Sequence, residues 1–193
     1  GTIGKSSMAK KYAAQSKALK GKTEQYLLFT DEGRLVILGS DKRGTIYGIY
    51  ELSRQLGVSP WHYWADVPAE KHAEVYVKEG CYTDGEPKVR YRGIFVNDEG
   101  PCTSTWVKNT FGHYAAGTEY YEKCFDLLLR LKANYMWPAM WMWSFYADDP
   151  ENGKTANTMG IMIGTSHHEP MAKNHQEWAR HRNEFGVWDY ATN

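Results

Sequence analysis

The sequence predicts an α/β protein in which a small mixed domain precedes a parallel sheet. Short apolar runs recur at 91–96, 134–140 and 161–164, and segments with helical periodicity separate them. This alternation is typical of consecutive βα units, whose strands pair in parallel. Nearer the start of the chain, a predicted hairpin precedes a predicted helix, which indicates a separate small domain with a helix packed on a sheet.

In the small domain, residues 7–20 have a composition that allows a helix. Two apolar runs at 25–29 and 34–38 flank Asp31-Glu32-Gly33, and this pattern predicts a hairpin. A polar segment at 83–87, Thr-Asp-Gly-Glu-Pro, is typical of a boundary loop. We therefore predict two domains, at 1–80 and 81–193.

Two further elements are expected in the small domain. Apolar residues recur at helical spacing over 42–56, Asp41 can cap the start of this helix, and Gly57 can end it. Residues 74–77 alternate between polar and apolar side chains, which predicts a strand.

The second domain is expected to follow the order strand, helix, strand. A helix is predicted to start with Thr118 as its cap, followed later by a turn at 148–153 and a short helix at 154–159. A further helix is predicted at 171–182, and a fourth strand is expected after it. The apolar stripe of the first of these helices consists of Cys124, Leu127, Leu128 and Leu131.

Composition excludes several classes of partner. The chain has 23 basic and 23 acidic residues among its 193, so it presents no charge excess that would attract nucleic acid or an anionic membrane surface. No apolar run of 18 residues exists that would span a membrane. The three cysteines lack the C-x-x-C spacing of a cysteine zinc site. By contrast, 8 Trp and 14 Tyr supply many flat faces with a polar edge, which suit sugar rings.

Aromatic and ionisable residues follow the predicted strands, where a parallel sheet or barrel binds its ligands. The first strand leads into Asp98 and Glu99, the second into Trp141, and the third into His167-His168-Glu169. Hydrolysis of a glycosidic bond needs two carboxylates some distance apart, which such strand ends can provide. The alternative for Asp98 or Glu99 is a loop acid that binds backbone amides, and for Asp98 we favour the site.

Residue spacing disfavours two other kinds of site. The cluster of His167, His168 and Glu169, with His175 further on, contains metal-ligand types. However, neighbouring histidines at a strand end diverge, and no H-x-x-x-H pair exists, so we expect no metal and no cofactor. Gly4-Lys5-Ser6 lacks the preceding strand and spaced glycine of a phosphate-binding loop, which favours a simple strand-to-helix turn.

Several motifs together resemble glycoside hydrolase family 115, the xylan α-1,2-glucuronidases. They cover most of the chain. The motifs are the segments 39–52 (Gly-Ser-Asp-Lys-Arg-Gly-Thr-Ile-Tyr-Gly-Ile-Tyr-Glu-Leu), 64–68 (Trp-Ala-Asp-Val-Pro), 92–99 (Arg-Gly-Ile-Phe-Val-Asn-Asp-Glu), 134–141, 148–153 and 164–171.

The resemblance implies an inverting hydrolase that removes glucuronic acid, or its 4-O-methyl ether, from xylan. It implies a small α/β domain of the hexosaminidase-like domain 2 type, followed by a (β/α)8 TIM barrel of which this chain supplies about three βα units. It places Asp98, Trp141 and His167 in substrate binding, and we assign Glu169 to the same role from its position after the third predicted strand. The catalytic acid and base are expected beyond Asn193, so the chain alone is expected to be inactive.

The resemblance also implies a glucuronoxylan or glucuronoxylo-oligosaccharide substrate and allows a homodimer. It implies a secreted or periplasmic protein, although residues 1–5 do not resemble a signal peptide. Two alternatives remain open. One is a carbohydrate-binding module without hydrolysis, and the other is a metal-dependent hydrolase on a TIM barrel.

Overall fold

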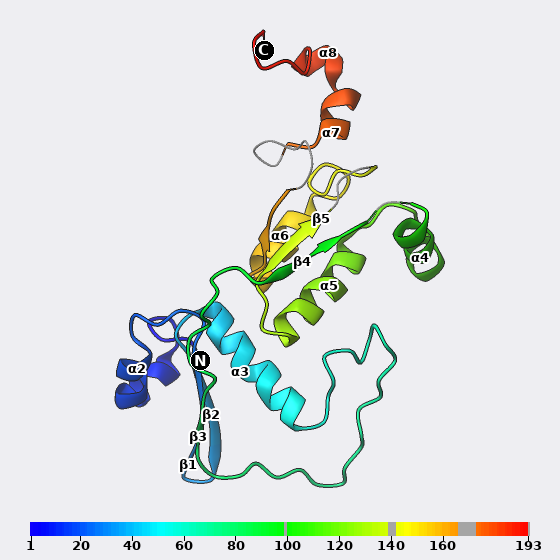
Figure 1. Cartoon of the computed structure of the whole chain (residues 1–193). Helices are drawn as coiled ribbons and strands as arrows, with labels where there is room; N and C mark the ends of the chain where they lie inside the picture. The colour runs from blue at the N-terminus through cyan, green and yellow to red at the C-terminus, as the bar shows by residue number, and fades with distance from the viewer. Residues whose placement is uncertain (99, 139–141, 166–172, 193) are drawn as a thin grey trace. The chain divides into compact units, whose positions relative to one another are not determined.

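The computed structural model describes residues 1–98, 100–138, 142–165 and 173–192 (Figure 1). These residues form a mixed α/β structure that contains small sheets, as the sequence predicts. The chain divides into two compact units. The first unit comprises Gly1–Arg92 with Leu127–Ala133, and the second comprises Gly93–Asp126 with Asn134–Asn193.

The sheet of the first unit is built on the predicted hairpin. Strand β1 (Tyr26–Asp31) pairs antiparallel with β2 (Arg34–Gly39). The turn residues Glu32 and Gly33 both have positive φ values, 47° and 73°. Two positive φ values define the type I′ turn, whose twist suits tightly connected antiparallel strands. The structure therefore confirms the hairpin.

The third strand of this sheet lies after residues 74–77, where the sequence predicts a strand. Strand β3 (Cys81–Tyr82) pairs with β1, which gives the order β2-β1-β3. The strand predicted at 74–77 is wrong, because these residues are irregular and Tyr76 is 82% exposed. Alternating side chains favour a strand only where neighbouring residues offer packing, and the exposed segment has little.

Helix α3 (Lys42–Gln55) confirms the helix predicted at 42–56. Asp41 caps it by accepting a hydrogen bond from the Gly44 amide at 2.8 Å. Gly57, with a φ of 90°, follows its last turn. The absence of a side chain at Gly44 lets the helix approach the carbonyl oxygen of Gln25 closely, so α3 packs directly on the start of β1.

The segment predicted as one helix at 7–20 forms two, α1 (Ser7–Lys11) and α2 (Ala13–Leu19). Tyr12 separates them with a non-helical ψ of 64°. Its ring packs edge-on against Phe29 with 5.1 Å between centroids, so core packing explains the break. The core of the first unit consists of Ala9, Tyr12, Leu19, Leu27, Phe29, Val36 and Leu38.

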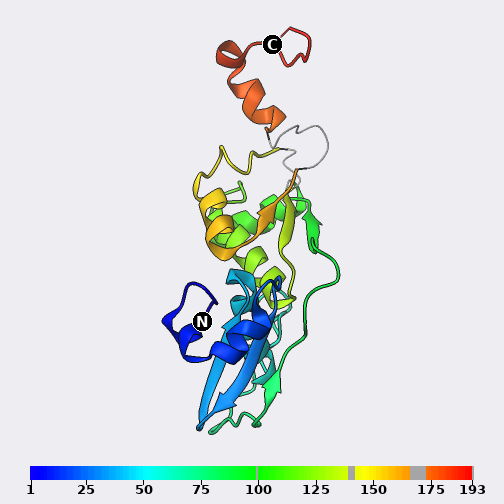
Figure 2. The same cartoon turned by 90° about the vertical axis from the view of Figure 1, so that its left-hand side faces the viewer.

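The second unit contains the parallel sheet that the sequence predicts. Its strands β4 (Gly93–Val96), β5 (Tyr135–Pro138) and β6 (Met162–Ile163) pair in parallel in the order β4-β5-β6. Met136 in the central strand is fully buried, whereas Trp137 is 41% exposed. Figure 2 shows α5 (Thr118–Arg130) and α6 (Glu151–Met159) to one side of these strands.

Two helices rather than one connect β4 to β5. Helix α4 (Cys102–Phe111) lies in a segment for which the sequence predicts no element. Helix α5 confirms the predicted helix, and its residues Cys124, Leu127 and Leu128 are buried. The prediction that Thr118 caps this helix is wrong, because Thr118 is its first helical residue and its hydroxyl donates to Asp149 at 2.8 Å. The prediction that Leu131 belongs to this buried stripe is wrong, because Leu131 lies beyond the end of the helix and is 46% exposed.

The remaining helices differ in length from the predictions. Helix α6 starts three residues before the predicted 154–159. The helix predicted at 171–182 is divided into α7 (His175–Arg180) and α8 (Arg182–Phe185), with the Asn174 side chain capping the first of these. Residues 186–192 contain no strand. Among the described residues, no helix is both long enough and apolar enough to cross a membrane.

Candidate functional site at the carboxyl ends of the parallel strands

The carboxyl ends of β4 and β5 lie at the same edge of the second sheet. Because the strands are parallel and Val96 is paired with Pro138, the residues that follow them start from neighbouring positions. Asn97 and Asp98 follow β4, and Gly164 and Thr165 follow β6. Parallel sheets bind their ligands at this edge, which makes it the candidate site.

Asp98 is the predicted site residue that the structure describes. It is only 1% exposed, and the hydroxyl of Tyr121 in α5 donates a hydrogen bond to its Oδ2 atom. A buried carboxylate needs such donors to offset the loss of water. Burial, reinforced by the negative charge of Asp98, raises the pKa of Tyr121 well above its usual range. The phenol therefore stays protonated and remains the donor.

The backbone before Asp98 has its own support. The Thr103 hydroxyl, in the first turn of α4, donates a hydrogen bond to the carbonyl oxygen of Asn97 at 2.5 Å. The amide of Gly100 lies 3.4 Å from the sulfur of Met142, which follows β5. These contacts tie the segment after β4 to a helix and to the segment after β5.

An exposed aromatic surface lies on the strands themselves. Phe95 in β4 is paired with Trp137 in β5, and their rings meet edge-on with centroids 5.9 Å apart. They are 43% and 41% exposed. The indole nitrogen of Trp137 donates a hydrogen bond to the carbonyl oxygen of Thr165, which fixes the ring. Flat aromatic faces of this kind can stack on sugar rings.

Among these aromatic residues, only Trp141 is predicted from the sequence as a site residue, and Trp137 and Tyr121 are not. The alternation of Tyr135, Met136 and Trp137 was a usable signal, because a buried Met136 places its neighbours on the opposite face. Tyr121 lies three residues before Cys124 and therefore on the buried stripe of α5. A tyrosine hydroxyl in such a stripe requires a polar partner, which could have pointed to Asp98.

The other predicted site residues lie outside the described part of the chain. These are Trp141, His167 and Glu169, together with Glu99 and His168. Their placement next to Asp98 stays a prediction. Among the described residues, no group of three or more histidine, cysteine or acidic side chains is arranged to hold a metal ion.

The acidic turn at 148–153 has a structural role. Asp149 accepts hydrogen bonds from the amide and the hydroxyl of Thr118, both at 2.8 Å. The Asn152 side chain donates to the carbonyl oxygen of Phe145 at 2.9 Å. Asp148 accepts the amide of Ser144 at 2.7 Å. The side chains of this motif therefore hold α5 and α6 in place and are engaged within the scaffold.

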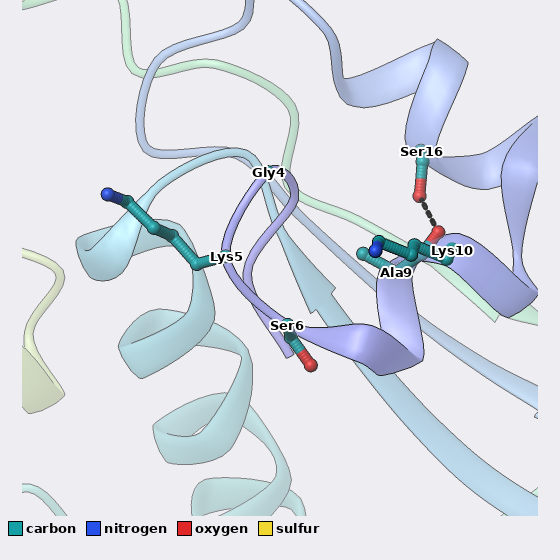
Figure 3. Close-up of a pocket in the computed structure, with 6 residues that line it drawn as sticks. All are labelled: Gly4, Lys5, Ser6, Ala9, Lys10 and Ser16. Atoms are coloured by element: carbon teal, nitrogen blue, oxygen red, sulfur yellow. Dashed lines mark hydrogen bonds between the residues drawn. The ribbon is translucent and has the colours of Figure 1, made fainter.

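A small open depression of about 260 Å³ lies at the start of the chain, away from the candidate site in sequence (Figure 3). Ser6 and Ser16 both line it, but their hydroxyls are already bonded. Ser6 accepts the Met8 amide at 3.2 Å, and Ser16 donates to the Ala9 carbonyl at 2.6 Å. Ser6 caps α1, so this segment is the predicted turn into a helix.

Comparison with known proteins connects this chain to one family. The family model described as glycosyl hydrolase family 115 matches residues 84–193. A solved structure, the family GH115 4-O-methyl-α-glucuronidase BtGH115A with specificity for decorated arabinogalactans, is 40% identical with a TM-score of 0.89. The match covers 100% of this chain and 26% of that one, so the chain spans about a quarter of that relative's length.

Two other comparisons add no further detail. A family 20 β-N-acetylglucosaminidase structure matches 88% of this chain and 38% of its own, with 16% identity and a TM-score of 0.44. A search of curated proteins gave no significant match.

Proposed function

The chain belongs to glycosyl hydrolase family 115, and we propose that it forms the N-terminal part of a longer enzyme that removes α-linked glucuronic acid, or its 4-O-methyl ether, from a polysaccharide. The observation that carries this proposal is 40% identity over the whole chain to a 4-O-methyl-α-glucuronidase. Because that relative is about four times longer, the activity is assigned to the longer protein.

The second unit is proposed to supply the first βα units of a (β/α)8 barrel. Three parallel strands separated by helices support this assignment. The exposed Phe95 and Trp137 on one side of the sheet are compatible with a surface that further strands or a ligand would cover. The first unit is proposed to be the small α/β domain of the hexosaminidase-like domain 2 type.

We assign substrate binding to Asp98, Trp141, His167 and Glu169. Asp98 follows β4 directly, and the other three belong to the segments after β5 and β6. A carboxylate or an imidazole can bind sugar hydroxyls, and an indole can stack on a sugar face. The general acid and base of an inverting mechanism are assigned to the remainder of the longer protein, so the chain alone is expected to be inactive.

The polysaccharide is either a glucuronoxylan, as first expected, or a decorated arabinogalactan like that of the solved relative. Both polymers carry a uronic acid substituent, so the same binding residues would recognise either of them. A secreted or periplasmic location is also part of this proposal, because a polysaccharide does not cross the plasma membrane. A homodimer of the longer protein remains part of this proposal.

The test uses the purified longer protein with glucuronoxylan and with decorated arabinogalactan, beside the 193-residue chain. The longer protein should release glucuronic acid or its methyl ether from at least one polymer, and the chain should release none. An inverting mechanism predicts that the first product from the α-linked substrate is the β-anomer, as seen by proton NMR. Release of the α-anomer first would reject inversion, and no release from either polymer would reject the activity.

A further inference from the structure

We propose that Tyr121 is a positioning residue, which acts through Asp98 and holds its carboxylate in the orientation needed for sugar binding. This inference rests on the proposed function, because it takes Asp98 as a substrate-binding residue. It concerns the contact between Tyr121 in helix α5 and Asp98 after β4, and both of these residues belong to the second unit.

The ring of Tyr121 is held by its neighbours. It is 1% exposed and packs edge-on against Phe145, with 4.7 Å between centroids. Tyr120 and Phe125 contact it at centroid distances of 5.2 and 6.2 Å. A ring enclosed on several sides cannot change rotamer without disturbing the core. Its hydroxyl therefore presents a donor at a fixed position.

The start of α5 is also fixed, because Asp149 binds both the amide and the hydroxyl of Thr118 at 2.8 Å. Tyr121 lies one turn after this anchor. The Tyr121 hydroxyl that bonds Asp98 therefore belongs to a helix whose first turn is fixed by Asp149, just before α6. This is the kind of support that keeps a binding group in a defined geometry.

The backbone that leads to Asp98 has a support of its own. The Thr103 hydroxyl in α4 donates a hydrogen bond to the carbonyl oxygen of Asn97 at 2.5 Å. Loss of the Tyr121 hydroxyl should therefore leave the backbone in place and change mainly the orientation of the Asp98 side chain. A charge-assisted hydrogen bond of this type is directional, so it selects one orientation of the carboxylate.

Substituting Tyr121→Phe removes the hydroxyl and retains the ring. In the longer protein, this variant should lose at least tenfold in kcat/KM per folded molecule, because small displacements of a binding group are costly. The changes in kcat and in KM should each resemble those caused by Asp98→Asn. Near-UV circular dichroism should show that the aromatic core is retained.

A buried tyrosine of the first unit provides a matched control. Tyr47 is also 1% exposed and donates a hydrogen bond from its hydroxyl to the carbonyl oxygen of Ala133 at 3.0 Å, so Tyr47→Phe removes an equivalent buried hydroxyl that does not contact Asp98. Its kcat/KM should change less than threefold. An equal loss in both variants would show that removal of any buried phenol hydroxyl has this effect and would overturn the proposal.

A double-mutant cycle completes the test. If Tyr121 acts through Asp98, then Tyr121→Phe should cause no further loss of kcat/KM in an Asp98→Asn background. Independent, additive losses would overturn the proposal. If Asp98→Ala abolishes activity while Tyr121→Phe stays within twofold of wild type, the positioning role alone is rejected. If Asp98→Ala itself retains normal turnover, the proposed role of Asp98 in binding is rejected as well.

Discussion

Asp149 accepts hydrogen bonds from both the amide and the hydroxyl of Thr118, each at 2.8 Å, although 31 residues separate the two in sequence. The carboxylate also accepts the Glu151 amide at 3.0 Å, at the start of α6. One side chain thereby satisfies backbone donors at the beginnings of two helices. Such amides have no partner within their own helix, so an external acceptor stabilises them.

We predict that Asp149→Ala destabilises the first turn of α5 by about 1–2 kcal/mol, the usual cost of losing a helix cap. Hydrogen exchange followed by mass spectrometry should show faster exchange in peptides covering 118–124. Glu122→Ala is the control, because this acid is exposed on the same helix and its loss should leave exchange unchanged. Equal protection in wild type and Asp149→Ala would contradict the capping role.

A second acid in the first unit gives a prediction about pH. Glu51 is 5% exposed and accepts hydrogen bonds from Arg54 at 2.5 Å and from Lys132 at 2.7 Å. Burial alone would raise the pKa of this carboxyl, but the hydrogen bonds from its cationic neighbours outweigh burial and lower the pKa to about 2. The folded state therefore favours the ionised form.

The stability that Glu51 contributes is complete above its unfolded pKa of about 4.3 and is lost as the pH falls toward 2. We predict that Glu51→Gln lowers the stability of the first unit by roughly 2 kcal/mol at pH 7, as expected for hydrogen bonds to a charged group. Thermal unfolding between pH 2.5 and 7 should show the difference from wild type shrinking below pH 4. Glu32→Gln, in the exposed turn, should have no such effect.

The glycines of α3 lead to a prediction about packing. A Cβ atom at Gly44 would lie 2.3 Å from the carbonyl oxygen of Gln25, and backbone cannot move aside as a side chain can. We predict that Gly44→Ala costs about 1–3 kcal/mol through overpacking. Gly153→Ala, on α6, would meet only the ring of Tyr146 at 3.2 Å and should be nearly neutral. Similar melting temperatures for the two variants would contradict this explanation.

The elements that could be predicted are those set by local chemistry. The positive φ values at Glu32 and Gly33 and the cap at Asp41 each depend on residues within a few positions, so sequence patterns reveal them. The failed predictions depend on distant contacts. Alternation at 74–77 lacks a strand partner, and Tyr12 interrupts a helical segment because its ring is needed against Phe29.

The candidate site likewise combines features that local sequence determines with features that depend on distant contacts. The position of Asp98 directly after β4 follows from an apolar run that ends in acids, and the structure places it there. Its burial and its bond to Tyr121 depend on how α5 packs, which no local pattern contains. Likewise, the pairing of Phe95 with Trp137 depends on the register between two strands that lie some forty residues apart.

The last prediction concerns the proposed binding residues in the longer protein. Asp98→Ala, Trp141→Ala, His167→Ala and Glu169→Ala should each reduce kcat/KM far more than they reduce stability, because residues after strand ends serve the ligand more than the scaffold. Loss of a hydrogen bond to a charged group corresponds to roughly ten- to a hundredfold in kcat/KM. Met136→Ala is the opposite control, because Met136 is fully buried in β5 and its truncation should cost about 2–5 kcal/mol of stability. Activity per folded molecule and the melting temperature should be measured for all five variants. If the four site variants melt many degrees lower yet turn over normally when folded, they behave like Met136 and the binding site lies elsewhere.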